Sequence, residues 1–141
     1  MKAIGTSHWA GTWRGGAGTI STQSDALSEV PYTYQTRFAD EHGVAPEELL
    51  AAAHASCFNQ ALANNLDRAG LAASAIATVV EVSYGITPAG RPTIEGSHIA
   101  VTATVPSTTD ADFAELAERS ARGCAISRVL SCDITVTATL R

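Results

Sequence analysis

The chain has 141 residues, of which 45% are hydrophobic, enough to build one sizeable core, and we expect a single domain over residues 1–141. The net charge of −5 and the scatter of the nine basic residues argue against nucleic acid as a partner, since phosphate-backbone binding needs clustered Lys and Arg. No apolar run approaches the roughly 20 residues that span a bilayer, and residues 1–14 lack the pattern of a signal peptide. We therefore expect a cytoplasmic protein without a membrane partner.

The N-terminal part is predicted to be rich in strands. Residues 7–14 and 19–22 are typical of two short strands around a glycine-rich turn at 15–18, and a further strand is expected near 32–38. A helix is then predicted over 46–69. Pro46 suits its first position, Glu47 and Glu48 follow in its first turn, and Gly70 stands beyond its last turn.

The second half alternates strands and helices. Strands are predicted over 79–86 and 94–105, because β-branched residues such as Ile99 and Val101 alternate there with polar ones. A helix over 109–122 is capped by Thr108 or Thr109, ends at Gly123, and is followed by a short helical turn at 125–130. A final strand covers 133–141. The order of elements predicts an α+β fold rather than a doubly wound one.

The helix at 46–69 has apolar residues around most of its circumference. Such a helix is buried on several sides, and a chain this short needs a second subunit to cover it, so we expect a two-fold homodimer. The residues in question are Leu49, Leu50, Ala53, Phe58, Ala61, Leu62 and Leu66.

Cys57 is the first candidate for chemistry. Structural disulfides are rare in a reducing compartment, so a catalytic or redox-sensing role for a cysteine becomes comparatively more frequent there. It lies roughly 16 Å from the start of its helix, beyond the reach of the helix dipole. A buried thiol has a raised pKa unless a cation is near. Arg37 is the candidate cation, and Glu47 is better oriented than Glu48 to hold it through a bidentate pair.

Cys124 is expected to differ, because it follows Gly123 and opens the short helical turn. Free amides and the helix dipole at that position should lower its pKa and make it a good resolving thiol. Cys132 enters the last strand without such surroundings and is interpreted as structural.

His54 lies three residues before Cys57 and raises two further hypotheses. One is a Cys–His pair for acyl transfer, and the other is a metal site using His54, Cys57 and another cysteine. A hydrogen-bonded core histidine is the more common finding, and no second pair of closely spaced ligands is present.

The motifs around both cysteines resemble those of the OsmC/Ohr group of organic hydroperoxide reductases, and especially its OsmC branch. Weaker matches are His8-Trp9 and Thr36-Arg37-Phe38. The strongest matching segments are Pro46-Glu47-Glu48-Leu49-Leu50, Ala52-Ala53-His54-Ala55-Ser56-Cys57-Phe58, and Gly123-Cys124-Ala125-Ile126-Ser127-Arg128-Val129-Leu130.

The resemblance implies an intertwined α+β homodimer of antiparallel sheets and two main helices, with active sites at the subunit interface. It implies that Cys57 is the peroxidatic cysteine, that Cys124 is the resolving cysteine, and that Arg37 and Glu47 are the pair that activates the Cys57 thiol. The implied substrates are organic hydroperoxides, reduced with electrons from a dithiol such as a lipoyl group, without metal, haem or flavin.

The sequence departs from the family pattern at two positions, and one alternative function stays open. Ala125 stands where the family commonly has proline, and Ala45 stands where a capping Asn is more usual, so each helix start gives up some stabilisation. The alternative function is a thiol redox sensor or ligand-binding protein of the same fold with slow turnover.

Overall fold

The computed structural model describes residues 1–39 and 41–141, and it divides into two compact units, Met1–Leu49 and Leu50–Arg141. The prediction of one domain over the whole chain stays a prediction. Across the described residues, no helix combines the length and the apolar character needed to cross a membrane.

The first unit contains a small antiparallel sheet of three strands in the order β1-β2-β3. The strands are β1 (Gly5–Ala10), β2 (Ala17–Thr22) and β3 (Val30–Thr33). Gly18 is required within β2, because a Cβ there would lie 2.5 Å from the carbonyl oxygen of His8 and 2.7 Å from the ring of Tyr32. The predicted hairpin around a glycine-rich turn is confirmed, although its strands begin and end a few residues earlier or later than predicted.

The strand predicted near 32–38 is wrong beyond Thr33. Helix α1 (Tyr34–Phe38) follows instead, because Thr33 and Thr36 form a reciprocal capping box. The Thr36 amide donates to the Thr33 hydroxyl at 3.2 Å and the Thr33 amide donates to the Thr36 hydroxyl at 3.1 Å. This cap outweighs the strand preference of the aromatic and β-branched residues in the segment. Arg37 therefore lies on a helix.

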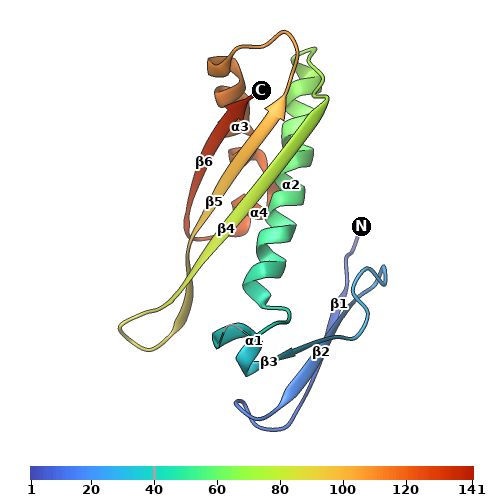
Figure 1. The fold of residues 1–141 in the computed structure, drawn as a ribbon, viewed down its shortest axis with the longest axis vertical. Coiled ribbons are helices and arrows are strands. Elements are labelled where there is room, and N and C mark those ends of the chain that lie inside the picture. Colours follow the sequence, from blue (N-terminus) through green and yellow to red (C-terminus); the bar gives the residue numbers. More distant parts are fainter. Residues whose placement is uncertain (40) are drawn as a thin grey trace. The chain divides into compact units, whose positions relative to one another are not determined.

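The second unit packs helices against one face of a second three-stranded sheet, as Figure 1 shows. Its strands are β4 (Ala75–Ile86), β5 (Pro92–Thr104) and β6 (Asp133–Leu140), and its helices are α3 (Asp110–Gly123) and α4 (Ala125–Val129). Helix α2 (Pro46–Arg68) begins in the last residues of the first unit and continues through the second. The predicted helices, the cap of α3 at Thr109 and the α+β class are confirmed.

The second sheet is mixed rather than purely antiparallel. Strands β4 and β5 pair antiparallel, but β6 pairs parallel to β5, with Ile99 opposite Val136. Helices α3 and α4 lie between β5 and β6 in the chain, and a long helical connection allows the chain to return in the same direction. The antiparallel expectation therefore fails for β6 alone.

The core of the second unit joins one stripe of α2 to the helix-facing side of β5. The buried residues of α2 are His54, Phe58, Leu62 and Leu66, spaced by four residues, so that they lie along one face. Alternate β5 residues from Ser97 to Ala103 are also buried, as the predicted alternation requires. His54 and Ser97 are the polar members of these two rows.

The other faces of α2 remain partly or fully exposed within the single chain, so the expected burial on several sides is not reached by one subunit. Large apolar residues elsewhere are exposed too, including Val79 at 70% and Val129 at 74%. Covering of these faces by a second subunit stays a prediction.

Candidate active site

The second unit brings Cys57 and Cys124 together as two free thiols that interact through a hydrogen bond. Cys57 projects from the middle of α2 and is half-buried, whereas Cys124 is 1% exposed. Cys124 is at once the last capping residue of α3 and the N-cap of α4. Its backbone amide donates to the carbonyl of Ser120 at 2.9 Å, which fixes this junction between helices.

The pKa of Cys57 lies below the ordinary value for a thiol, for a reason the sequence reasoning missed. Burial alone raises this pKa, but hydrogen bonds from the Cys124 thiol and from the backbone amides of Ile126 and Ala125 outweigh it. These amides form the first turn of α4, whose N–H groups have no partner within the helix. The start of α4 therefore favours the thiolate of Cys57.

The pKa of Cys124 is raised, which corrects the prediction that the start of α4 would lower it. Burial raises this pKa most, and the hydrogen bond with Cys57 raises it further. The amide and hydroxyl of Ser127 and the amide of Ile126 act in the opposite direction without prevailing. The two thiols thus differ in acidity: Cys57, the more exposed one, has the lower pKa, and the buried Cys124 donates a hydrogen bond to it.

His54 is a fully buried histidine held between two serine hydroxyls. Its Nδ1 lies 2.9 Å from Ser97 Oγ and its Nε2 lies 2.7 Å from Ser127 Oγ. Burial lowers its pKa, so the ring is neutral near pH 7. Because both ring nitrogens bond to serines, the geometry supports neither the Cys–His pair nor a metal site at His54. Among residues 1–39 and 41–141, no three potential metal ligands lie together.

Arg37 and Glu47 form a close ion pair within the first unit. Arg37 Nη2 donates to Glu47 Oε1 at 2.6 Å, and Nε lies 3.2 and 3.3 Å from the two carboxylate oxygens. The carboxylate holds the side of the guanidinium in a fixed orientation. The side chain of Arg37 remains 33% exposed and that of Glu47 15% exposed.

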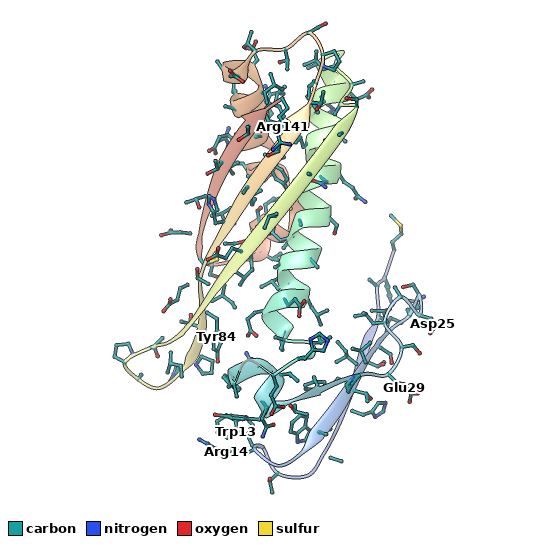
Figure 2. The ribbon with its side chains drawn as sticks, viewed as in Figure 1. Trp13, Arg14, Asp25, Glu29, Tyr84 and Arg141 are labelled. Atoms are coloured by element: carbon teal, nitrogen blue, oxygen red, sulfur yellow. The ribbon has the colours of Figure 1, made fainter. Side chains whose placement is uncertain are left out.

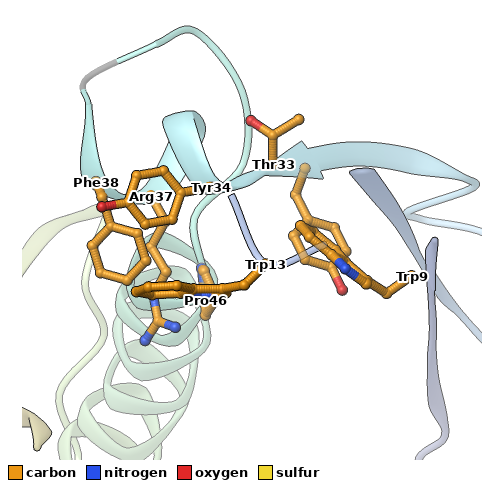
Figure 3. A pocket seen from close by; sticks show the side chains of 8 residues that line it. Trp9, Trp13, Thr33, Tyr34, Arg37, Phe38 and Pro46 are labelled. Carbon is orange, nitrogen blue, oxygen red and sulfur yellow. The ribbon is translucent and has the colours of Figure 1, made fainter. Parts of the chain in front are cut away.

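An aromatic pocket of about 320 Å³ lies beside this ion pair, also within the first unit. Figure 3 shows Trp13 and Pro46 close to the guanidinium of Arg37, with Tyr34 and Phe38 next to them. Trp13 meets the edge of Tyr34 at a centroid distance of 5.0 Å. The residues lining the pocket are Trp9, Trp13, Tyr32, Thr33, Tyr34, Arg37, Phe38 and Pro46.

Arg14 stabilises the rim of this pocket. Its guanidinium carbon lies 5.4 Å from the ring centroid of Trp13 and 5.0 Å from that of Tyr34, both within the range of a cation–π interaction. Figure 2 shows Trp13 and Arg14 next to each other in the turn between β1 and β2. These contacts hold the rings of Trp13 and Tyr34 in place although Trp13 is 64% exposed.

The four predicted site residues thus form one pair within each unit, Arg37 with Glu47 and Cys57 with Cys124, and Cys132 belongs to neither pair. Cys132 is a half-buried free thiol between α4 and β6. Sequence reasoning missed Ser97, Ser127 and the amides of Ala125 and Ile126. Only Ser97 carried a local signal, since it continues the buried side of the alternating β5 pattern.

Comparison with known proteins gives a consistent family assignment. Residues 39–139 match the family model described as OsmC-like protein. The chain is 38% identical over 132 residues to a protein named Peroxiredoxin OsmC from Escherichia coli, covering 94% of this chain and 92% of that protein.

Solved structures show the same fold at low sequence identity. An OsmC-like protein of unknown function from Vibrio cholerae aligns with a TM-score of 0.76 at 12% identity, covering 98% of this chain and 99% of that one. The organic hydroperoxide resistance protein OhrB of Bacillus subtilis aligns with a TM-score of 0.71 at 19% identity, covering 100% and 98%.

Proposed function

The chain belongs to the OsmC-like protein family, and from that premise we propose that it is a thiol-dependent peroxidase that reduces organic hydroperoxides to alcohols in oxidative stress defence. The observation that carries the proposal is the pair Cys57 and Cys124, with the pKa of one thiol lowered and that of its neighbour raised. This difference in pKa suits a nucleophilic cysteine next to a resolving cysteine. The names of its relatives, a peroxiredoxin and a hydroperoxide resistance protein, support the same activity.

The reaction proceeds in three steps. The Cys57 thiolate attacks the terminal oxygen of the hydroperoxide, the O–O bond breaks, and the departing alkoxide takes a proton to leave as an alcohol. The resulting sulfenic acid condenses with the Cys124 thiol, forming a disulfide and releasing water. An external dithiol then reduces the disulfide by exchange and is itself oxidised.

Arg37 acts on the peroxide rather than mainly on the thiol pKa. Lowering a thiol pKa from about 8.5 to about 6 gives roughly 30 times more thiolate at pH 7. The less basic thiolate is roughly tenfold less nucleophilic, so the net gain in rate is only a few-fold. A guanidinium held by Glu47 instead orients the peroxide and stabilises negative charge on the departing oxygen. The aromatic pocket beside Arg37 suits an apolar alkyl or aryl group, which favours organic hydroperoxides over hydrogen peroxide.

The assembly proposed for this activity is a single OsmC-like domain over residues 1–141 that forms an intertwined homodimer in the cytoplasm, with the active sites at the interface. The family match spans parts of both units, and the exposed faces of α2 support a covering subunit. The chemistry uses only thiols and needs no cofactor. The reductant is a dithiol, with a lipoylated protein as the preferred partner.

Steady-state and stopped-flow reactions with cumene hydroperoxide and dihydrolipoamide test the proposal. We expect rapid oxidation of the protein and repeated turnover, abolished in Cys57→Ser and kept in Cys132→Ser. Oxidation by one equivalent without recycling by any dithiol would instead favour a redox sensor or ligand-binding protein of the same fold.

A further inference from the structure

A buried row of hydrogen-bonding side chains ends at Cys124. Ser97 comes from β5, His54 from α2 and Ser127 from α4, and their exposed fractions are 2%, 0% and 8%. The row is continuous, since the two contacts of the imidazole measure 2.9 and 2.7 Å. Polar groups this deeply buried are costly unless they are paired.

The position of Ser127 places its hydroxyl next to the sulfur of Cys124. Cys124 is the N-cap of α4, so Ser127 is the third residue of the helix. The N-cap and the third residue are neighbours in the first turn of a helix, and the amide of Ser127 bonds to Cys124 as well as its hydroxyl. The Arg128 amide donates to the Cys124 carbonyl at 3.1 Å, which shows that the turn is closed. The Ser127 hydroxyl bonds to Cys124 in a way that favours the thiolate.

The protons in this row are limited, because a neutral imidazole has a single N–H. If Nε2 carries it, His54 donates to the oxygen of Ser127, and the Ser127 hydrogen is left to point at Cys124. The Ser97 hydroxyl then donates to Nδ1. If Nδ1 carries the proton instead, Ser127 must donate to Nε2, and its hydroxyl cannot donate to Cys124. The row therefore has one arrangement that can donate a hydrogen bond to a Cys124 thiolate and one that cannot.

We propose that Ser127 is a further catalytic residue, which donates a hydrogen bond to the Cys124 thiolate, and that His54 and Ser97 are positioning residues that hold Ser127 in the donating orientation. The inference rests on the proposed peroxidase function and deepens it.

The donated hydrogen bond acts in both reactions of Cys124. In disulfide formation the S–H bond of Cys124 and the S–O bond of the Cys57 sulfenic acid break, the S–S bond forms, and the proton joins the departing hydroxide as water. In reduction the dithiol attacks the Cys57 sulfur, and the Cys124 sulfur leaves with the electron pair of the S–S bond. Both steps place negative charge on a sulfur that is 1% exposed to solvent, where a donor matters most.

The first test separates resolution from peroxide attack. Protein is mixed with one equivalent of cumene hydroperoxide, sulfenic acid is trapped at intervals with dimedone, and disulfide is followed by mass spectrometry. In Ser127→Ala we expect disulfide formation to slow by about 10- to 100-fold, the range for hydrogen bonds to charged groups, so that sulfenic acid accumulates. His54→Gln and Ser97→Ala should slow it less, and Ser127→Thr should restore most of the rate.

Ser120→Ala is the matched control. Ser120 is also buried, bonds to Asn65 at 2.9 Å and lies in α3 next to the same junction, but it is outside the row. Disulfide formation at the wild-type rate in Ser127→Ala, or equal slowing in Ser120→Ala, would overturn the inference.

The second test uses no peroxide, so it gives a result for Ser127 even if the protein is not a peroxidase. In a Cys57→Ser background, the pH dependence of iodoacetamide alkylation at Cys124 reports its pKa directly. Replacing Ser127 with Ala should raise that pKa by about one to two units. An unchanged pKa would refute the role of Ser127, whether or not the protein turns over peroxide.

The ionisable groups around Ser127 stay constant in this comparison. Besides His54 and the two cysteines, they are Glu118, Arg122 and Arg128, which line a pocket of about 210 Å³ together with Ser127. None is altered between the two proteins, so a difference in pKa belongs to the missing hydroxyl.

Discussion

At the scale of single residues, the two thiols owe their different character to neighbours on α4. The amides of Ala125 and Ile126 lower the pKa of Cys57, while burial raises that of Cys124. Sequence reasoning had given the start of this helix to Cys124 and left Cys57 dependent on Arg37. The structure assigns the start of α4 to Cys57 instead, and the proposed role of Arg37 is to act mainly on the peroxide.

Arg37→Lys tests this assignment. Lysine keeps the charge but loses the planar fork that Glu47 holds and that positions a peroxide. We expect kcat/KM for cumene hydroperoxide to fall roughly tenfold or more, while the Cys57 pKa, measured by thiolate absorbance, stays low. A Cys57 pKa that rises in step with the loss of rate would show that Arg37 sets the thiolate after all.

His54 predicts a dependence of stability on pH. Its folded pKa lies below the ordinary value of 6.5, so the unfolded chain binds a proton that the folded chain resists. As the pH falls below about 6.5 the free energy of unfolding should therefore decrease, until the lower folded pKa is reached.

Urea unfolding at pH 5 and pH 7 measures this effect. The loss of stability between the two values should be smaller in His54→Gln than in the wild type, because glutamine does not titrate. Equal losses in both proteins would assign the pH dependence to other groups.

At the scale of elements, most of the fold could be predicted because each helix and strand carries its own signals. Pro46 at the start of α2 and the alternation in β5 are examples. The errors arose where a second interaction outweighed the local hydrophobic pattern. A capping box at Thr33 and Thr36 turned a strand-like segment into α1, and the long connection through α3 and α4 made β6 parallel to β5. The contact of the α4 amides with Cys57 joins residues 68 and 69 positions apart in the sequence and had no local signal.

The start of α4 gives a prediction at this scale. Proline at position 125 suits a first helical residue, and the extended ψ of 129° at Cys124 accepts a following proline. Ala125→Pro should therefore stabilise the fold by about 0.5 kcal/mol. It also removes an amide that favours the Cys57 thiolate, so the pKa of Cys57 should rise. Ala125→Gly keeps the amide and should leave the pKa unchanged; a low pKa in the proline variant would contradict the role of this N–H.

At the scale of the whole molecule, α2 remains the main argument for a dimer. One of its faces supplies the core stripe from His54 to Leu66, while apolar residues on its other faces stay accessible in one chain. Val79 and Val129 add exposed apolar surface, and such surface favours association.

Sedimentation velocity at micromolar concentration measures the assembly directly. We expect a single species with the mass of two chains of 14.6 kDa, and Val79→Lys should weaken it if β4 contributes to the interface. A stable monomer that retains peroxidase activity would contradict both the dimer and its role in completing the active site.

The pairing of Cys57 with Cys124 is tested most directly by locating the disulfide after reaction with one equivalent of cumene hydroperoxide. Peptide mass spectrometry without reduction distinguishes the three cysteines. We predict a Cys57–Cys124 disulfide, with Cys132 still a free thiol. A disulfide that includes Cys132, or a chain that remains fully reduced, would contradict the account.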